Sequence, residues 1–285
     1  MRLALLRLAL AALFASSNAA SARDATFTTS DNVRLHVIEQ GDPARNTVVV
    51  VPGWTMPAWI FQRQIDVLSQ SYHVLALDPR GQGESEIAPS GYTYRRRGED
   101  IAELIAANGN RPVVLVGWSL GVLDSLAYVA EYGDQRIAGL VLIDNSIGEN
   151  PPPTASRVPA LRGPRLARDE QMRRFVRGMF LHNPGEAYLE RLTADALRTP
   201  PEVAAALGNY AVDRSFWRQA VYSVQRPVLY IVRPRFAAQA ANLAANDPYA
   251  ETVLFEHAGH ALFVDDPVRF DTLLLEFLRR RVWPS

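Results

Sequence analysis

The sequence predicts an α/β protein with a mostly parallel, doubly wound sheet, helices on both faces and an inserted helical cap. Short runs rich in Val, Ile and Leu alternate with longer segments whose apolar residues recur at helical spacing. This alternation is typical of parallel strands connected by helices, which bury both faces of the sheet. A chain of 285 residues, 48% of them hydrophobic, is long enough to form one large core.

Strands are expected where short apolar runs end at turn residues. Two strands flank the Asp31-Asn32 turn in ATFTTSDNVRLHVIEQG, and TVVVVPGW at 47–54 is a continuous β-branched run closed by Pro52-Gly53. The other expected strands span 73–78, 113–117, 137–144, 227–232 and 252–257. Helical spacing predicts helices around 59–68 and over 97–107, 120–132 and 267–281.

The alternation stops between residues 147 and 225, a stretch rich in Pro and Arg without a strand signal. It is too long for a simple crossover, and residues such as Phe175, Met179 and Leu189 make it too apolar for a disordered linker. We therefore expect a core domain formed by 23–146 and 226–285, with a helical cap at 147–225.

The N-terminal segment is typical of a secretory signal. Arg2 and Arg7 precede an apolar stretch over 8–15, and the small residues at 20–22 form an A-x-A-like cleavage site. We expect a signal peptide over 1–22, cleavage near Ala22 and a periplasmic or secreted mature protein. The apolar stretch is shorter than the roughly 20 residues that span a bilayer, so no stable membrane insertion is expected after cleavage.

Composition narrows the classes of function. Thirty basic residues, all Arg, balance thirty acidic residues, so the chain has no overall positive field to attract a nucleic acid. The chain has no Cys, which excludes a disulfide, a thiolate nucleophile and a zinc site built on sulfur.

The stretch VVLVGWSLGVL at 113–123 places one serine where a buried strand becomes a helix. Gly117, Ser119 and Gly121 form the pattern G-x-S-x-G, in which the glycines leave room for a sharp turn that exposes the serine hydroxyl. The first backbone N–H groups of the following helix, that of Leu120 above all, have no helical acceptor and can bind a developing oxyanion.

Five stretches, in order, carry a resemblance to a known family: VVVVPGW, LDPRGQGES, VGWSLG, LVLID and EHAGHALFVDDP. They stand where the α/β-hydrolase superfamily has its oxyanion loop, its D-x-R-G-x-G-x-S loop, its nucleophile elbow, its sixth strand and its histidine loop. The chain resembles this superfamily over nearly the whole mature sequence, and in particular its small carboxylesterases and cofactor-free haloperoxidase or perhydrolase relatives. The resemblance implies that 147–225 is the family's helical cap.

The resemblance implies Ser119 as nucleophile and His260, the last residue of HAGH, as its base. His257 is the alternative base, although we expect it to lie at the end of a strand. Many relatives carry the acid after the strand that corresponds to 227–232, where this chain has no carboxylate before Asp247. Asp247 is expected to cap a turn, so Asp144, at the end of LVLID, is the favoured acid. A dyad that has lost its acid is the remaining alternative.

The oxyanion donors are expected to be the backbone N–H groups of Trp54 and Leu120. Met56 and Trp118 are expected to line an apolar substrate pocket.

These assignments predict an exported serine hydrolase that cleaves a carboxylic ester, or a related acyl bond, of a small molecule through an acyl-enzyme. The chemistry requires no metal and no organic cofactor. Two alternatives remain open: a haloperoxidase or perhydrolase-like activity, and a non-catalytic binding protein, which gains weight if Asp144 lies away from His260. The sequence leaves the oligomeric state, the substrate and the choice among esterase, perhydrolase and lactonase activity open.

Overall fold

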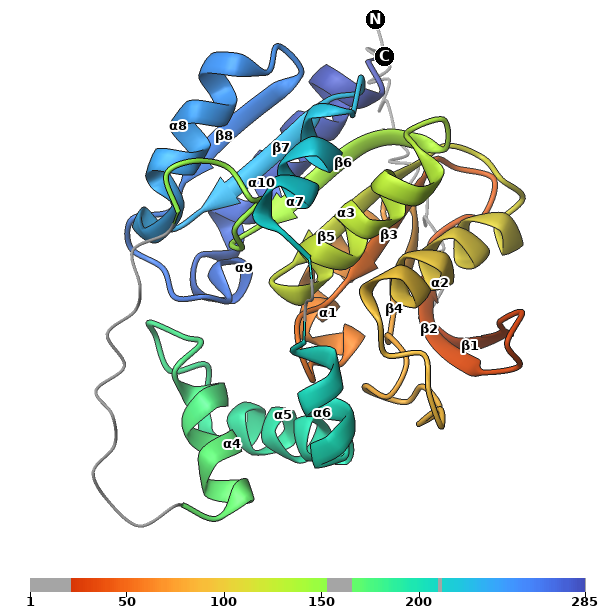
Figure 1. Ribbon diagram of the computed structural model, residues 1–285, viewed down its shortest axis with the longest axis vertical. Coiled ribbons are helices and arrows are strands. Elements are labelled where there is room, and N and C mark those ends of the chain that lie inside the picture. Colours follow the sequence, from red (N-terminus) through yellow and green to blue (C-terminus); the bar gives the residue numbers. More distant parts are fainter. Residues whose placement is uncertain (1–21, 153–165, 210–211, 285) are drawn as a thin grey trace, which may run out of the picture.

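An eight-stranded sheet forms the centre of the computed structural model, which describes residues 22–152, 166–209 and 212–284 (Figure 1). The strand order is β1-β2-β4-β3-β5-β6-β7-β8. β2 runs antiparallel to both β1 and β4, and the neighbours from β4 through β8 are parallel. The predicted signal peptide lies, apart from Ala22, outside the described residues.

The continuous apolar runs form strands because consecutive side chains point to opposite faces of the sheet, and both faces are buried. In β3, for example, Val48 and Val50 pack in one core, whereas Val49 and Val51 pack in the other. The strands are β1 Arg23–Thr28, β2 Arg34–Gln40, β3 Thr47–Val51, β4 His73–Leu77, β5 Val113–Trp118, β6 Ile137–Ile143, β7 Val228–Val232 and β8 Ala250–Leu254.

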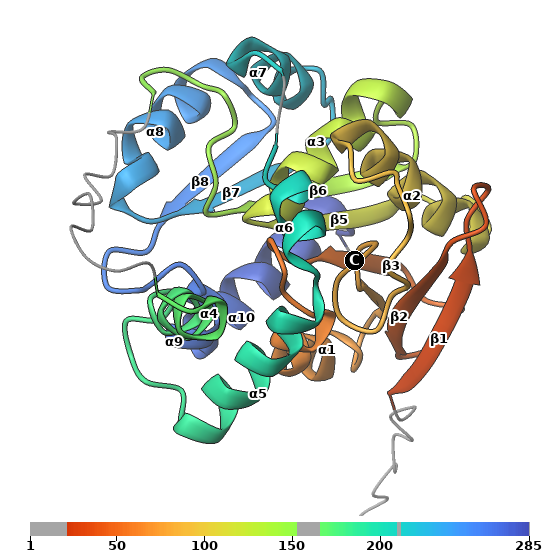
Figure 2. The ribbon, with the colours of Figure 1, turned by 60° about the horizontal axis from the view of Figure 1, so that its bottom comes forward.

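Helices cover both faces of the sheet, as the doubly wound prediction requires (Figure 2). One face carries α2 Tyr94–Ala107, α3 Leu120–Tyr132, α7 Arg214–Tyr222 and α8 Ala237–Asn246, with η2 Pro234–Phe236. The other carries α1 Gln62–Leu68, α9 Leu262–Asp265 and α10 Pro267–Phe277, with η1 Ala58–Phe61 and η3 Leu278–Val282. No helix within the described ranges is long and apolar enough to cross a bilayer.

Among the described residues between β6 and β7 there are four helices: α4 Arg168–Arg177, α5 Glu186–Arg198, α6 Pro201–Leu207 and α7. Figure 1 shows α4, α5 and α6 as a separate group of helices beside the sheet domain. α7 instead packs against α3, and its residues Trp217, Ala220 and Val221 belong to the main core. The stretch 147–225 thus contains a cap group and one helix of the core layer, while residues 153–165 lie outside the described part.

The differences from the sequence expectation include two element boundaries and one additional helix. α2 begins at Tyr94, three residues early, because the Thr93 hydroxyl accepts the Arg96 N–H at 3.3 Å and caps the helix. α8 was not predicted; it is rich in alanine, which favours helices without producing a periodic apolar pattern. β8 spans Ala250–Leu254 rather than 252–257, so His257 lies in the turn beyond the strand and not at the strand end as expected.

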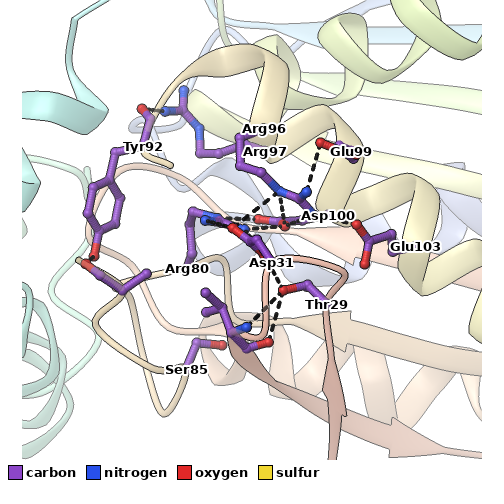
Figure 3. A network of polar contacts seen from close by, with 12 residues as sticks. Thr29, Asp31, Arg80, Ser85, Tyr92, Arg96, Arg97, Glu99, Asp100 and Glu103 are labelled. Atoms are coloured by element: carbon purple, nitrogen blue, oxygen red, sulfur yellow. Dashed lines mark hydrogen bonds and ion pairs between the residues drawn. The ribbon is translucent and has the colours of Figure 1, made fainter. Parts of the chain in front are cut away.

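A buried arginine ties the loop after β4 to its neighbours (Figure 3). The Arg80 side chain is fully buried, and its Nε and Nη2 each donate to one oxygen of Asp100 at 2.6 Å. Its Nη1 donates to Asp31, in the β1–β2 turn, at 2.9 Å. Removing one partner of such a buried pair costs about 3–5 kcal/mol, because the other charge is left buried without compensation. Arg80 therefore fixes the loop that follows Asp78.

The Asp31 carboxylate gives this network a pH dependence. Its hydrogen bond from Arg80 lowers the pKa of Asp31 to about 2. A lowered pKa in the folded state stabilises the fold above the unfolded value, and this contribution is lost as pH falls from about 4 toward 2. Asp31→Asn is expected to lower the free energy of unfolding by about 1 kcal/mol near pH 6, a value reduced for solvent screening of this partly exposed group.

Urea unfolding of wild type and variant at several pH values checks this expectation. The difference between them should shrink steadily below about pH 4. Glu276→Gln, which neutralises an exposed carboxylate on α10, is the control and should show no such trend. A difference for Asp31→Asn that stays constant down to about pH 2.5 would contradict the ion-pair explanation.

Candidate active site

Ser119 occupies the turn between β5 and α3 in a backbone conformation that few side chains adopt. Its φ is +54° and its ψ is −115°. Such a conformation costs on the order of 1–3 kcal/mol and persists only where the surroundings enforce it. The two glycines of G-x-S-x-G explain how the turn fits: a Cβ on Gly117 would lie 2.3 Å from the Gly121 carbonyl oxygen, and one on Gly121 would lie 2.2 Å from the Val51 carbonyl oxygen.

Ser119, His260 and Asp144 meet at the carboxyl ends of the parallel strands. The Ser119 Oγ lies 2.8 Å from His260 Nε2, and His260 Nδ1 lies 2.6 Å from Asp144 Oδ2. The three residues follow β5, β8 and β6, whose ends lie on one edge of the sheet. The structure therefore brings together three residues that the sequence analysis singled out.

The loop that carries His260 is held on both sides of the imidazole. The Trp118 Nε1 donates to the His260 carbonyl oxygen at 2.9 Å, and the Trp118 ring packs 5.1 Å from the imidazole. The Gly259 N–H donates to Asp265 at 2.7 Å. The position of the imidazole thus follows from the tertiary packing of this loop. His257, the alternative base, lies in the same loop, but His260 is the histidine that contacts both Ser119 and Asp144.

Asp144 is buried at the end of β6, and a residue that the sequence analysis missed holds it there. The Arg233 backbone N–H donates to Asp144 Oδ1 at 3.0 Å, and the Arg233 Nε donates to Oδ2 at 2.6 Å. Arg233 is the first residue after β7. Many relatives are expected to carry the acid at this position, after the strand. The arginine found there instead was a sequence signal that Asp144, the favoured acid, has a cationic partner.

The loop after β3 lies directly against the serine. A Cβ on Gly53 would lie 3.0 Å from Ser119 Cβ, which places Gly53 directly beside the serine side chain. Thr55 has a φ of +61°, and its N–H donates to Gln82 Oε1. Leu120 is the first residue of α3, where backbone N–H groups have no helical acceptor. Gln82 was not predicted, although its loop was expected to shape this backbone.

Asp78, the first residue after β4, binds backbone N–H groups of the two loops that follow β3 and β4. Its Oδ1 accepts the Ala58 N–H at 2.5 Å, and its Oδ2 accepts from the Glu84 N–H at 2.9 Å and contacts His36 Nδ1 at 2.8 Å. Burial raises the pKa of Asp78, and the hydrogen bond with Asp78 raises the pKa of His36. These contacts make Asp78 a support for the loops around the site.

The two residues expected to line a substrate pocket are buried in the hydrophobic core. Met56 and Trp118 are each only 1% exposed and pack in the hydrophobic core, so their prediction as pocket lining is corrected. A separate apolar cluster stands beside the serine, formed by Leu120 with Val203 and Leu207 of α6, against which Trp54 and Tyr92 pack. The sequence shows that the side chains of both groups are apolar, but it does not show which of them face the site.

Trp54 connects the loop after β3 to two of the cap helices. Its Nε1 donates to the Ala204 carbonyl oxygen of α6 at 2.7 Å, and its ring forms a T-shaped pair with Phe175 of α4, with the ring centroids 5.1 Å apart. Two of the cap helices therefore contact the loop beside Ser119. Within the described ranges, no three His, Cys, Asp or Glu side chains form a group that could hold a metal ion.

A mostly parallel sheet covered by helices on both faces, with a serine at the turn after a central strand and a histidine and an aspartate beside it, defines an α/β hydrolase. The chain belongs to the alpha/beta hydrolase fold family, whose model matches residues 46–267.

Relatives with solved structures and curated descriptions agree with this family. A "putative aryl esterase" from Burkholderia cenocepacia superposes with a TM-score of 0.78 and 29% identity, covering 90% of this chain and 98% of that one. A pimeloyl-[acyl-carrier protein] methyl ester esterase from Xanthomonas oryzae pv. oryzae is 27% identical over 247 residues, 81% of this chain and 94% of that protein. A non-heme chloroperoxidase from Streptomyces lividans is 33% identical over 119 residues, 41% of this chain and 43% of that protein.

Proposed function

We propose that this protein is a serine esterase that cleaves a carboxylic ester of a small molecule. One observation carries the proposal: a single imidazole lies 2.8 Å from a serine hydroxyl and 2.6 Å from a buried carboxylate. A neutral serine hydroxyl is a weak nucleophile and needs a base that a third group orients. Membership in a family whose similar members are described as esterases supports the same activity.

The geometry supports a two-step acyl transfer. His260 Nε2 takes the hydroxyl proton as Ser119 Oγ attacks the ester carbonyl, and Asp144 holds the ring with Nδ1–H toward its carboxylate. The backbone N–H groups of Trp54 and Leu120 stabilise the negative oxygen of the tetrahedral intermediate. The imidazolium then protonates the leaving alcohol. Water attacks the acyl-enzyme by the same steps and releases the acid.

Fluorophosphonate labelling tests this proposal directly. The probe phosphonylates a serine activated by a nearby base, so the folded protein should become labelled at Ser119, identified by peptide mass spectrometry. His260→Ala should label far more slowly. A folded wild-type protein that fails to label would contradict the proposal and favour a non-catalytic binding protein. A non-catalytic binding protein would be favoured if Asp144 lay away from His260. The Asp144 Oδ2 and His260 Nδ1 atoms are instead 2.6 Å apart.

Perhydrolysis is a second candidate, favoured by the similarity to a non-heme chloroperoxidase. In that reaction hydrogen peroxide replaces water and attacks the acyl-enzyme. The acyl group is transferred to the peroxide, the peracid leaves, and Ser119 regains its proton. Comparing peracid formation with acid release, in the presence of peroxide, separates the two activities. Release of acid alone would exclude perhydrolysis.

We also propose that the protein is exported, on the basis of the signal-like segment 1–22. N-terminal sequencing of the protein from the periplasm or medium of its host should give Arg23 as the first residue. A protein that retains Met1 and stays with the cytoplasmic fraction would contradict export.

A further inference from the structure

We infer that Arg233 is a positioning residue of the active site: its guanidinium fixes Asp144 and opposes protonation of His260, which extends activity toward lower pH. This inference rests on the proposed esterase function. It concerns a residue with no counterpart in the three-residue mechanism above, and it follows from contacts that Arg233 makes with two of those residues.

Arg233 holds both oxygens of the Asp144 carboxylate. Its backbone N–H donates to Oδ1 at 3.0 Å, and its Nε donates to Oδ2 at 2.6 Å. His260 Nδ1 approaches the same Oδ2, also at 2.6 Å. The Asp144 side chain is fully buried, whereas the Arg233 side chain is 27% exposed. A carboxylate fixed at both oxygens cannot turn away from the imidazole, so Arg233 sets the direction in which Asp144 faces His260.

Arg233 also places a positive charge next to the imidazole. Its Nη2 lies 3.4 Å from His260 Nδ1. When Nδ1 carries its hydrogen toward Asp144, both of these nitrogens are donors, so the contact is a close approach of a cation to the ring and not a hydrogen bond. A cation at this distance disfavours a second proton on the ring. It also offsets the Asp144 charge, which by itself would favour the imidazolium.

Several elements place polar or charged groups in the active site around Asp144 and the His260 loop. Asp144 follows β6, Arg233 follows β7, and Ser119 lies between β5 and α3. From α9, Asp265 accepts the Gly259 N–H and also the N–H groups of Leu181 and His182, which occupy its oxygens. Tyr230 of β7 donates its hydroxyl to the Asn145 carbonyl oxygen, and burial raises its pKa, which keeps it neutral. Arg233 is the cation of this group that contacts the ring.

The test separates charge from shape. Arg233→Gln removes the charge but keeps an N–H donor for Asp144, Arg233→Met removes both, and Arg233→Lys keeps the charge. All three retain the backbone N–H that donates to Asp144. Arg235→Met is the matched control, because Arg235 is exposed two residues further on and stacks on Phe236, 5.5 Å away.

Two measurements are made on each variant. One is the midpoint of the acid limb of kcat/KM for p-nitrophenyl acetate, and the other is the pH at which the His260 imidazole is half protonated, followed by ¹⁵N NMR and assigned with His260→Gln. Both midpoints should rise by about 0.5 to 1 pH unit in Arg233→Gln and Arg233→Met, because the imidazole keeps its proton to higher pH. Arg233→Lys and Arg235→Met should stay within about 0.2 unit of wild type.

The outcomes are distinct. Unchanged midpoints in both neutral variants would overturn the inference, and so would equal shifts in Arg233→Gln and Arg233→Lys, which would show that shape and not charge matters. A shift in Arg235→Met as large as in Arg233→Gln would also overturn it. If the wild type does not hydrolyse esters, the proposed function fails, while the NMR titration, which needs no substrate, still decides the role of Arg233.

Discussion

Replacing Ser119 with alanine is expected to lower kcat/KM for an activated ester by about 10⁴- to 10⁶-fold. The variant lacks the nucleophile, so no acyl-enzyme forms, and only the oxyanion donors and substrate binding remain to accelerate attack by water. The fold should persist because the β5–α3 turn depends on Gly117 and Gly121, which the variant keeps. Steady-state kinetics on purified protein, with circular dichroism to verify folding, measure the effect.

Ser223→Ala is the matched control for this experiment. Ser223 follows α7 and donates its hydroxyl to the Ala220 carbonyl oxygen at 2.8 Å. Its loss should leave kcat/KM within about twofold of wild type, as expected for a substitution away from the site. If Ser119→Ala kept a tenth or more of the wild-type activity, Ser119 would not be the nucleophile.

Replacing Asp144 with asparagine is expected to lower kcat by about 10⁴-fold with the fold intact. The asparagine amide can turn its NH₂ group toward His260 Nδ1, which stabilises the tautomer with the proton on Nε2. An imidazole in that tautomer cannot accept the proton of the Ser119 hydroxyl. The asparagine oxygen, in the place of Oδ1, still accepts the Arg233 backbone N–H, whereas the Arg233 Nε loses its acceptor. The partly exposed Arg233 side chain can turn toward solvent, so the fold should survive. Kinetics near neutral pH and thermal unfolding together measure the two effects.

Asp247→Asn provides the comparison, because Asp247 was the other carboxylate that the sequence left open. It follows α8, and its Oδ1 accepts the Tyr249 N–H at 2.9 Å, the turn-capping role that its position predicts. This variant should keep its activity. An Asp144→Asn variant within tenfold of wild type would show that Asp144 does not orient the base, and the dyad alternative would then stand.

Most of the fold could be predicted from the sequence, because strands that are buried on both faces of the sheet are continuous apolar runs. β3, β4, β5, β6 and β7 are uninterrupted apolar runs that end at turn residues, so each run lies within one or two residues of the observed strand. The assignment of α7 could not be made in this way. Its apolar face packs on α3, a contact between segments distant in sequence that helical spacing does not encode.

Local sequence signals likewise predicted one part of the candidate site, whereas contacts between distant segments determine another part. Ser119 was accessible to sequence reasoning because its turn requires glycines at fixed spacing, whereas His260 and Asp144 came from family resemblance. The direction of a side chain was not accessible: Met56 and Trp118 proved to be core residues, because whether a large apolar group faces a site depends on what packs behind it. Arg233 and Gln82 act on the site through contacts across the fold, which spacing along the chain cannot reveal.

Trp54 belongs to two parts of the molecule at once. Its backbone lies in the loop beside Ser119, while its indole donates to the Ala204 carbonyl oxygen of α6 and packs against Phe175 of α4. Any movement that lifts the cap to admit a bulky molecule therefore pulls on the residue whose backbone N–H is a proposed oxyanion donor. The size of the substrate should consequently affect kcat as well as KM.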